Sequence, residues 1–103
     1  MAKPRNKSSL STNNGPLFSV RNVGITPAAQ DHFNKLRKNP LELVWKHIFL
    51  EQGLLGDQDH QSNIKALKTG DRIFSSYQVG DEKVWIITEA DRSYTTIMFP
   101  SEY

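Results

Sequence analysis

The segment Glu89-Ala90-Asp91-Arg92 places two carboxylates and a guanidinium within one short turn. A carboxylate can act as a general base, and an arginine can stabilise negative charge on a phosphate or another anion. If a sheet brings Arg72 near this turn, the charged side chains together would form an anion-handling site. The alternative is a solvated turn whose charges pair with one another and contribute little. The sequence leaves both interpretations open, including whether Glu89, Asp91 and Arg92 form one site.

A metal site would need several histidine or carboxylate ligands at a suitable spacing. The candidates are His47, Asp57, Asp59 and His60. Asp59 and His60 are adjacent and would diverge on a helix, and the chain contains no Glu-x-x-His pair. We therefore expect no metal ion and no cofactor. We interpret Asp57 or Asp59 as a helix cap and the two histidines as surface residues.

Motifs for a catalytic serine and for a phosphate-binding loop are absent from the sequence. Ser75 and Ser76 lie in an expected strand rather than in a Gly-x-Ser-x-Gly turn. The loop Gly53–Gly56 lacks a following Lys-Ser/Thr pair and does not follow a strand. Whether the protein is an enzyme is therefore uncertain, and the sequence favours a protein that is not one.

Length and composition fit one domain preceded by a polar tail. The chain has 103 residues and no cysteine, which excludes a disulfide framework and a thiolate metal site. Residues 1–16 are rich in Ser, Asn, Lys and Pro and have little apolar surface to bury. Burial there cannot offset the entropy lost on ordering, so we predict a disordered basic tail over residues 1–16 and a single domain over residues 17–103.

The net charge divides unevenly between the predicted tail and the predicted domain. Lys3, Arg5 and Lys7 give the tail a charge of +3, whereas the whole chain carries +2. The domain therefore has a net charge of −1, because it contains 10 of the 13 Lys and Arg residues and all 11 Asp and Glu residues. A nucleic-acid-binding domain is expected to be clearly basic. The domain does not fit that class, although the tail leaves a basic DNA-binding arm open.

Three strand-forming segments with turn signals between them occupy the end of the sequence. They are Arg72–Tyr77, Val84–Thr88 and Tyr94–Phe99, separated by Gly80-Asp81 and by the Glu89–Arg92 turn. β-Branched and aromatic residues dominate the second and third segments. The second segment is apolar on both faces. We therefore predict an antiparallel meander with this segment in the middle and with upstream elements covering it.

Upstream of the meander, the pattern predicts one strand and three helices. Thr26 and Asn39 are N-cap residues, each followed by proline at the first helical position. Gly24 is expected to end the strand, and Gly53 and Gly70 to end the second and third helices. The predicted elements are a strand over Leu17–Val23 and helices over about Pro27–Lys38, Pro40–Glu51 and Gln58–Lys68.

Together these elements predict an α+β fold. An N-terminal strand and two to three helices would pack on a three- to four-stranded, mostly antiparallel sheet. Apolar residues from every element are expected in the core. They are Phe18, Val20, Phe33, Leu36, Leu43, Val44, Ile48, Ile64, Leu67, Ile73, Val84, Ile86, Ile97 and Phe99.

The longest distinctive motif is the run Trp85–Ser93, Trp-Ile-Ile-Thr-Glu-Ala-Asp-Arg-Ser. With this run, the chain resembles a family of short, uncharacterised proteins encoded on plasmids and other mobile elements, over roughly residues 24–103. The family has Asp-Trp where this chain has Leu54-Leu55. The resemblance implies a genomic setting and no particular activity. Further matching positions are His47, Asp59, Asn63, Gly70, Arg72, Ser75, Tyr77, Thr95, Thr96, Pro100, Glu102 and Tyr103.

The predicted order of a strand, two helices and an antiparallel meander also resembles the RelE/ParE toxin fold. If this resemblance extends to function, the protein is a ribonuclease or a growth-inhibiting toxin. The resemblance then implies Arg72, Arg92 and Tyr94 as RNA-cleaving residues, with Glu89 as a further catalytic candidate. The slightly acidic domain speaks against this function, because such ribonucleases need strong attraction for phosphate.

The sequence favours a mobile-element accessory protein that binds a macromolecular partner and is not an enzyme. Leu54 and Leu55 are expected to be exposed, which would suit a protein partner or self-association, and the Glu89–Arg92 turn is the other expected contact surface. The alternatives are a RelE-like ribonuclease or toxin and a DNA-binding accessory protein that uses the basic tail. No apolar run approaches the length of a membrane span, so we expect a cytoplasmic protein without membrane contact.

Overall fold

The computed structural model of the chain describes residues 15–103, so the predicted tail of residues 1–16 lies almost entirely outside the described part. The DNA-binding arm expected from Lys3, Arg5 and Lys7 therefore stays a prediction. The described elements are β1 (Asn22–Ile25), α1 (Pro27–Leu36), α2 (Leu41–Ile48), α3 (Asp57–Thr69), β2 (Ile73–Val79), β3 (Glu82–Thr88), β4 (Tyr94–Met98) and the 3-10 helix η2 (Pro100–Glu102).

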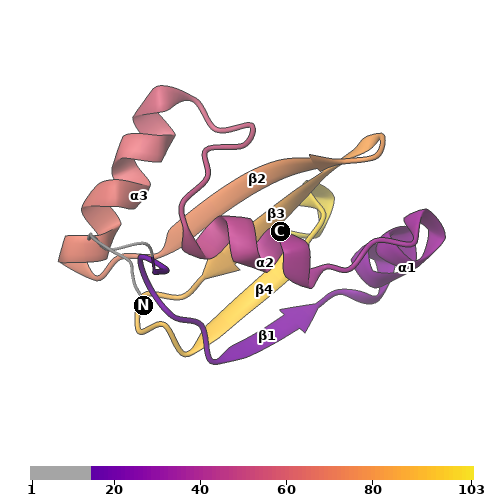
Figure 1. Ribbon diagram of the computed structural model, residues 1–103, viewed down its shortest axis with the longest axis horizontal. Helices are drawn as coiled ribbons and strands as arrows, with labels where there is room; N and C mark the ends of the chain where they lie inside the picture. Colours follow the sequence, from indigo (N-terminus) through magenta and orange to yellow (C-terminus); the bar gives the residue numbers. More distant parts are fainter. Residues whose placement is uncertain (1–14) are drawn as a thin grey trace, which may run out of the picture.

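The four strands form one open sheet in the order β1-β4-β3-β2 (Figure 1). β2, β3 and β4 pair antiparallel, as predicted for the meander, and β3 lies in its middle. β1 adds to β4 in parallel, with Val23 opposite Thr95 and Ile25 opposite Ile97. The predicted α+β fold with a mostly antiparallel sheet is confirmed.

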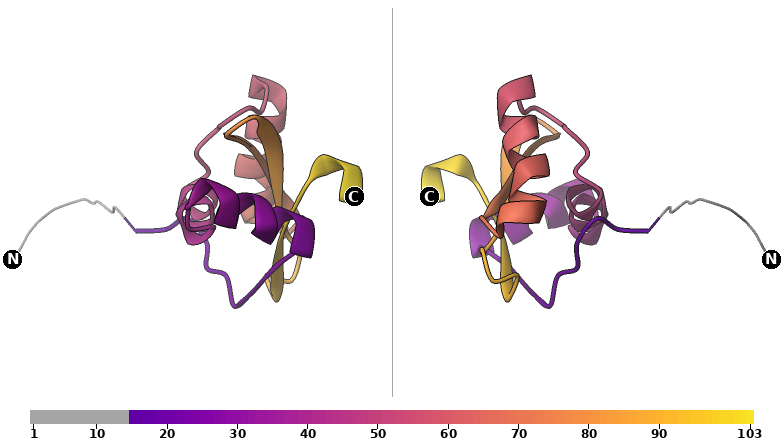
Figure 2. Two further views of the ribbon diagram at one scale, coloured as in Figure 1. Left: turned by 90° about the vertical axis from the view of Figure 1, so that its right-hand side faces the viewer. Right: turned by 90° about the vertical axis from the view of Figure 1, so that its left-hand side faces the viewer.

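The sheet has one face covered by α2 and an opposite face on the side of η2 (Figure 2). Side chains alternate along each strand, so every second residue of β2, β3 and β4 points toward α2. We call the opposite side the η2 face; Phe74 and Trp85 lie on it. The core between α2 and the sheet contains Phe33, Leu43, Val44, Ile48, Tyr77, Val79, Val84, Ile86 and Ile97.

The first strand lies later in the chain than the sequence predicts. The expected strand Leu17–Val23 ending at Gly24 is wrong, because β1 spans Asn22–Ile25 and contains the glycine. Gly24 lets the Tyr94 ring lie across β1, since a Cβ there would displace the hydroxyl end of that side chain. The segment before β1 is irregular, and its Phe18 packs against the core.

α1 begins as predicted, whereas α2 begins one residue later than predicted, because its N-cap is Pro40 rather than Asn39. Both helices end earlier than predicted. Thr26 caps α1, because its Oγ1 accepts a hydrogen bond from the backbone N–H of Ala29 at 3.3 Å. α2 ends at Ile48 rather than near Glu51. Leu50 adopts the left-handed conformation, with φ 54°, and its side chain is buried, so the chain turns inward before Gly53 is reached.

α3 also differs in its details from the prediction. Gly56 is its N-cap, so neither Asp57 nor Asp59 caps the helix; both lie in its first turn, where carboxylates favour the helix dipole. Two residues expected in the core, Leu36 on α1 and Ile64 on α3, are 38% and 39% exposed. The Leu36 side chain lies beside Gly80 in the β2–β3 hairpin, at the margin of the core.

The outer edge of β2 is covered by α3 and by the loop that precedes it. The side chain of Asn63 on α3 donates to the carbonyl oxygen of Phe74 at 2.6 Å and accepts from the Phe74 N–H at 3.1 Å. Two residues further along the strand, the Leu54 N–H donates to the Ser76 carbonyl oxygen at 2.8 Å. An uncovered edge would offer these groups to another chain.

Candidate functional site

Arg92, the last residue of the charged turn, points into the molecule and holds three chain segments together. Its Nη2 donates to the carbonyl oxygen of Ala66 on α3 at 3.0 Å. Its Nη1 donates to the carbonyl oxygens of Asp71, Glu89 and Ala90 at 2.7, 3.2 and 3.1 Å. The guanidinium is therefore committed to backbone oxygens of the α3–β2 connection and of its own turn.

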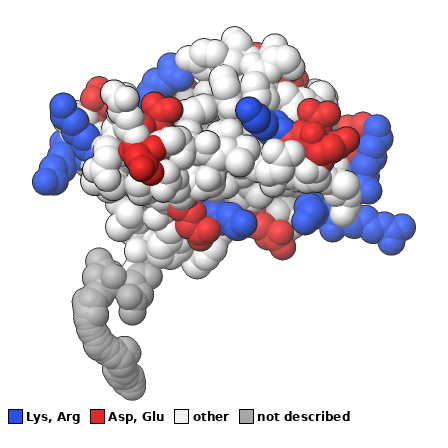
Figure 3. All heavy atoms as spheres, turned by 90° about the horizontal axis from the view of Figure 1, so that it is seen from above, with Lys and Arg blue, Asp and Glu red and all other residues white. Residues whose placement is uncertain are grey.

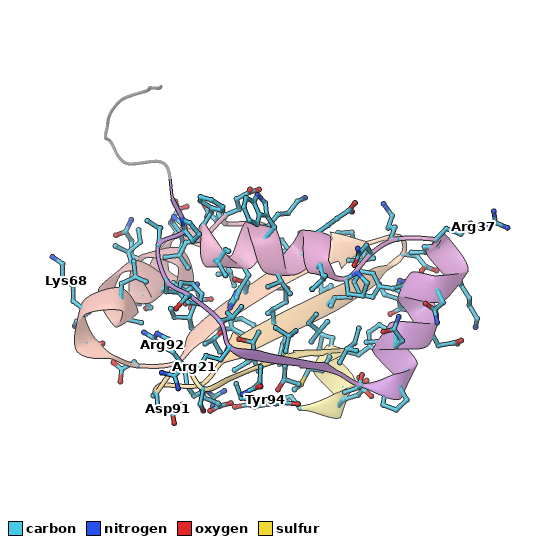
Figure 4. The ribbon with its side chains drawn as sticks, turned by 60° about the horizontal axis from the view of Figure 1, so that its bottom comes forward. Arg21, Arg37, Lys68, Asp91, Arg92 and Tyr94 are labelled. Atoms are coloured by element: carbon cyan, nitrogen blue, oxygen red, sulfur yellow. The ribbon has the colours of Figure 1, made fainter. Side chains whose placement is uncertain are left out.

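The carboxylate of Asp91 points away from the Arg92 guanidinium, on the solvent side of the same turn (Figure 4). It accepts hydrogen bonds from Ser93 Oγ at 2.6 Å and from the Ser93 N–H at 2.9 Å. These two bonds, with a smaller contribution from the nearby Arg21 guanidinium, lower the pKa of Asp91 below its ordinary value. Glu89 is exposed. The two charged side chains thus point in opposite directions: Arg92 binds backbone carbonyl groups inside the molecule, and Asp91 forms an Asx turn on the solvent side.

Arg72 belongs to a different cluster, on the η2 face. Its Nη2 donates to Tyr103 Oη at 2.8 Å, and its guanidinium carbon lies 5.6 Å from the centre of that ring. The hydrogen bond to Tyr103 is the main reason that the pKa of Arg72 is raised. Tyr103 packs edge-on against Trp85, which packs edge-on against Phe74. Tyr94, the third ribonuclease candidate, is 45% exposed and lies over β1.

The two leucines expected to be exposed have different surroundings. Leu54 is 47% exposed, whereas Leu55 is 8% exposed, so the expectation is correct for Leu54 and wrong for Leu55. The cause is the backbone at Gly53, which has φ 58° and lies so close to β2 that a Cβ would collide with the Ser76 carbonyl oxygen and the Tyr77 ring. The loop therefore follows the edge of the sheet instead of projecting from it.

A buried polar network links α2 to three strands, and the sequence analysis did not anticipate it. His47 is fully buried rather than a surface residue, and its Nδ1 lies 2.7 Å from Ser75 Oγ. Its Nε2 lies 2.8 Å from Thr88 Oγ1, which lies 2.8 Å from Thr95 Oγ1. Burial lowers the pKa of His47 to about 4. The spacing of four residues from Leu43 is the sequence signal that places His47 on the inner face of its helix.

The histidine–serine pair in this network is structural rather than nucleophilic. Ser75 and Thr88 are buried together with His47, so no substrate in solvent can reach the serine oxygen. A serine nucleophile must be accessible as well as hydrogen-bonded to its base. The network instead satisfies polar groups inside the core and fixes how α2 lies on the sheet.

The outer face of α2 carries an apolar ridge that the sequence analysis also missed. Leu41 and Trp45 are 59% and 61% exposed and lie one helical turn apart. The Trp45 ring packs on Phe49, one turn further along, with ring centres 5.1 Å apart. We define the apolar ridge as Leu41, Trp45 and Phe49. Glu42 and Lys46 form a parallel row of opposite charges beside it.

Depressions open on the surface at both ends of β2. One, of about 550 Å³, lies between the β2–β3 hairpin and η2, and the other, of about 330 Å³, lies between α3 and β2. Within residues 15–103, no three His, Cys, Asp or Glu side chains are grouped so that they could hold a metal ion. In the same part of the chain, no helix has the length and apolar character needed to cross a membrane.

Comparisons with known proteins found no matching family model, no matching curated protein and no matching solved structure. The resemblances to the mobile-element family and to the RelE/ParE fold therefore stay predictions.

Proposed function

We propose that this chain is a non-enzymatic accessory protein of a mobile element that binds another protein through the apolar ridge. The genomic setting is supported by the Trp85–Ser93 motif. The binding function is supported by one observation above all. Leu41 and Trp45 are more than half exposed on one face of a helix whose other face is anchored in the core.

The ridge has the composition and rigidity of a protein-contact site. Tryptophan is among the residues that most often dominate the energy of protein–protein interfaces. Trp45 is held on α2, and its contact with Phe49 orients the ring in advance. A side chain that is already ordered loses less entropy when a partner binds.

The surface charge also suits a protein partner. In the view of Figure 3, Lys and Arg are interspersed with Asp and Glu, and uncharged atoms fill much of the area between them. Residues 17–103 carry a net charge of −1, since they include 10 basic and 11 acidic residues. A nucleic-acid interface requires a continuous basic surface.

The test is affinity capture from a bacterial lysate with three forms of the chain. These are the wild type, Trp45→Asp on the ridge, and Ile64→Asp as the matched control. Ile64 is a partly exposed apolar residue on α3, so both variants place one charge at an exposed apolar position. Circular dichroism checks that all three are folded.

The proposal expects a protein retained by the wild type and by Ile64→Asp, and lost with Trp45→Asp. It is overturned if Trp45→Asp retains every protein that the wild type retains. Capture of further copies of this chain counts as a protein partner in this experiment.

A ribonuclease or toxin is the second candidate, and one observation favours it. Arg72 and Tyr103 are exposed and hydrogen-bonded to each other on the η2 face, so a cation and a phenol are available together. Such a pair suits phosphate binding and proton transfer. Arg92 is less suited to catalysis, since its donors are occupied by backbone carbonyls.

Growth and translation after induction in a bacterial host separate the two functions. The wild type is compared with Arg72→Ala, because loss of Arg92 would disturb the fold. The protein-binding proposal expects no arrest from either form. Arrest by the wild type that disappears with Arg72→Ala, at equal amounts of folded protein, would establish the toxin instead.

A further inference from the structure

We propose that the partner of the apolar ridge is a second copy of this chain, bound with its α2 antiparallel to the first. This inference rests on the proposed function and names its partner. The argument comes from the order of residues on the exposed face of α2, which makes this face complementary to itself.

Two rows run along the exposed face of α2. The apolar row contains Leu41, Trp45 and Phe49, and the charged row contains Glu42 and Lys46. The buried positions of α2 lie on the opposite side of the helix and anchor it on the sheet, so the two rows stay fixed relative to the core. The charged row has its acidic residue toward the helix N-terminus and its basic residue toward the C-terminus.

A two-fold axis places equivalent rows of two antiparallel helices side by side in reversed order. With the axis level with the middle of α2, Glu42 lies beside Lys46 of the second copy, and Lys46 beside the second copy's Glu42. Trp45 then packs between the apolar side chains of the other ridge. In a parallel pair related by a two-fold axis, the two charged rows would lie on opposite sides of the interface and would not contact each other, so only the antiparallel pair gains these ion pairs.

Leu17 extends the apolar surface at one end of the ridge. Its N–H donates to the carbonyl oxygen of Ile48 at 2.9 Å, which holds it at the C-terminal end of α2, and its side chain is 52% exposed. In the antiparallel pair, this end meets the Leu41 end of the other helix. Both ends of each ridge are thereby covered by apolar residues.

The experiment measures the molar mass of the purified full chain by light scattering and analytical ultracentrifugation over a range of concentrations. We expect a wild-type dimer whose dissociation constant is weakened about 100-fold by Trp45→Asp. Ile64→Asp should leave the dimer unchanged. Thermal unfolding of each variant excludes loss of structure as the cause.

Charge reversal tests the antiparallel geometry itself. Glu42→Lys and Lys46→Glu each place two pairs of like charges across the proposed interface, so each variant alone should dissociate at least about tenfold more readily. An equimolar mixture of the two variants restores opposite charges at both contacts and should form a mixed dimer. A change in the stability of α2 alone cannot restore association on mixing.

A wild type that stays monomeric at high concentration overturns the inference. So does a dimer whose dissociation constant is unchanged by Trp45→Asp or by the charge reversals. A monomeric wild type whose lysate capture still depends on Trp45 would refute the second copy as partner and leave the proposed function standing. Absence of both dimer and ridge-dependent capture would refute both.

Discussion

The guanidinium of Arg92 hydrogen-bonds the carbonyl oxygen of Ala66, 26 positions earlier in the chain, at 3.0 Å. The same oxygen accepts the N–H of Gly70 at the end of α3. A carbonyl oxygen can accept two hydrogen bonds, and carbonyl groups in the last turn of a helix carry partial negative charge, which a cation complements. One side chain of the β3–β4 turn therefore fixes where α3 ends and where β2 begins.

Replacement of this arginine should destabilise the fold. Arg92→Ala removes a charge-assisted donor from four carbonyl oxygens, so we expect the free energy of unfolding to fall by about 2–3 kcal/mol. Arg72→Ala is the control, because its guanidinium is exposed and should cost less than about 0.5 kcal/mol. Urea denaturation measures both values. Equal losses of unfolding free energy would show that the hydrogen bonds of Arg92 to the four carbonyl oxygens do not stabilise the fold.

The His47 network makes stability depend on pH. Burial lowers the pKa of His47 from 6.5 to about 4, so between these pH values the unfolded chain binds the proton more readily than the folded one. The contribution is complete above pH 6.5 and is lost as the pH falls toward 4. It amounts to about 3 kcal/mol.

The measurement for this pH dependence is urea denaturation of the wild type and His47→Gln at several pH values between 7 and 4. The variant keeps His32 and His60, so the difference between the two curves isolates His47. The wild type should lose more stability than the variant over this range. Parallel curves would show that His47 does not titrate differently in the folded state.

Three glycines give a graded series of alanine substitutions. Gly53→Ala combines a left-handed backbone with a collision against β2, so we expect a loss of more than about 2 kcal/mol. Gly70→Ala has the left-handed backbone and open space, and should lose about 1 kcal/mol. Gly56→Ala has neither problem, so only a small loss of helix capping is expected. Thermal denaturation ranks the three, and a different order would contradict the loop geometry.

Asn63 should protect the edge of β2. Asn63→Ala removes both hydrogen bonds to the Phe74 backbone, and we expect a loss of about 2 kcal/mol together with faster exchange of the Phe74 amide hydrogen. Ser62→Ala is the neighbouring control, since the Ser62 hydroxyl bonds within its own helix. If the Phe74 amide hydrogen exchanges at the same rate in the Asn63 variant, α3 does not protect this edge of the sheet.

Features that depend on local chemistry could be predicted from the sequence. The Gly80-Asp81 hairpin loop, the Thr26 cap and the Gly70 stop each follow from the conformations that a few neighbouring residues prefer. These signals are strong enough to locate the meander and all three helices. The position of β1 was missed because its pairing is decided by contact with β4, far along the chain.

Exposure along α2 could not be predicted from residue type. Trp45 looks like a core residue and is exposed, whereas His47 looks like a surface residue and is fully buried. The apolar arc of α2 is wider than the part that the sheet covers, so the placement of the helix decides which side chains are hidden. The hydrogen bonds of Arg92 could not be predicted for a similar reason, since its partner on α3 is near it only in the folded chain.

The parallel pairing of β1 with β4 has a consequence for how the chain is made. The side chain of Asn22 donates to the carbonyl oxygen of Ser93, 71 positions later, so this pairing must close a long loop. Closing a loop of that length costs about 4 kcal/mol of chain entropy before β1 gains its partner. During synthesis, β1 emerges early and has no strand to join until β4 has followed. We therefore expect the meander and helices to assemble first, with the docking of β1 as the late step in folding.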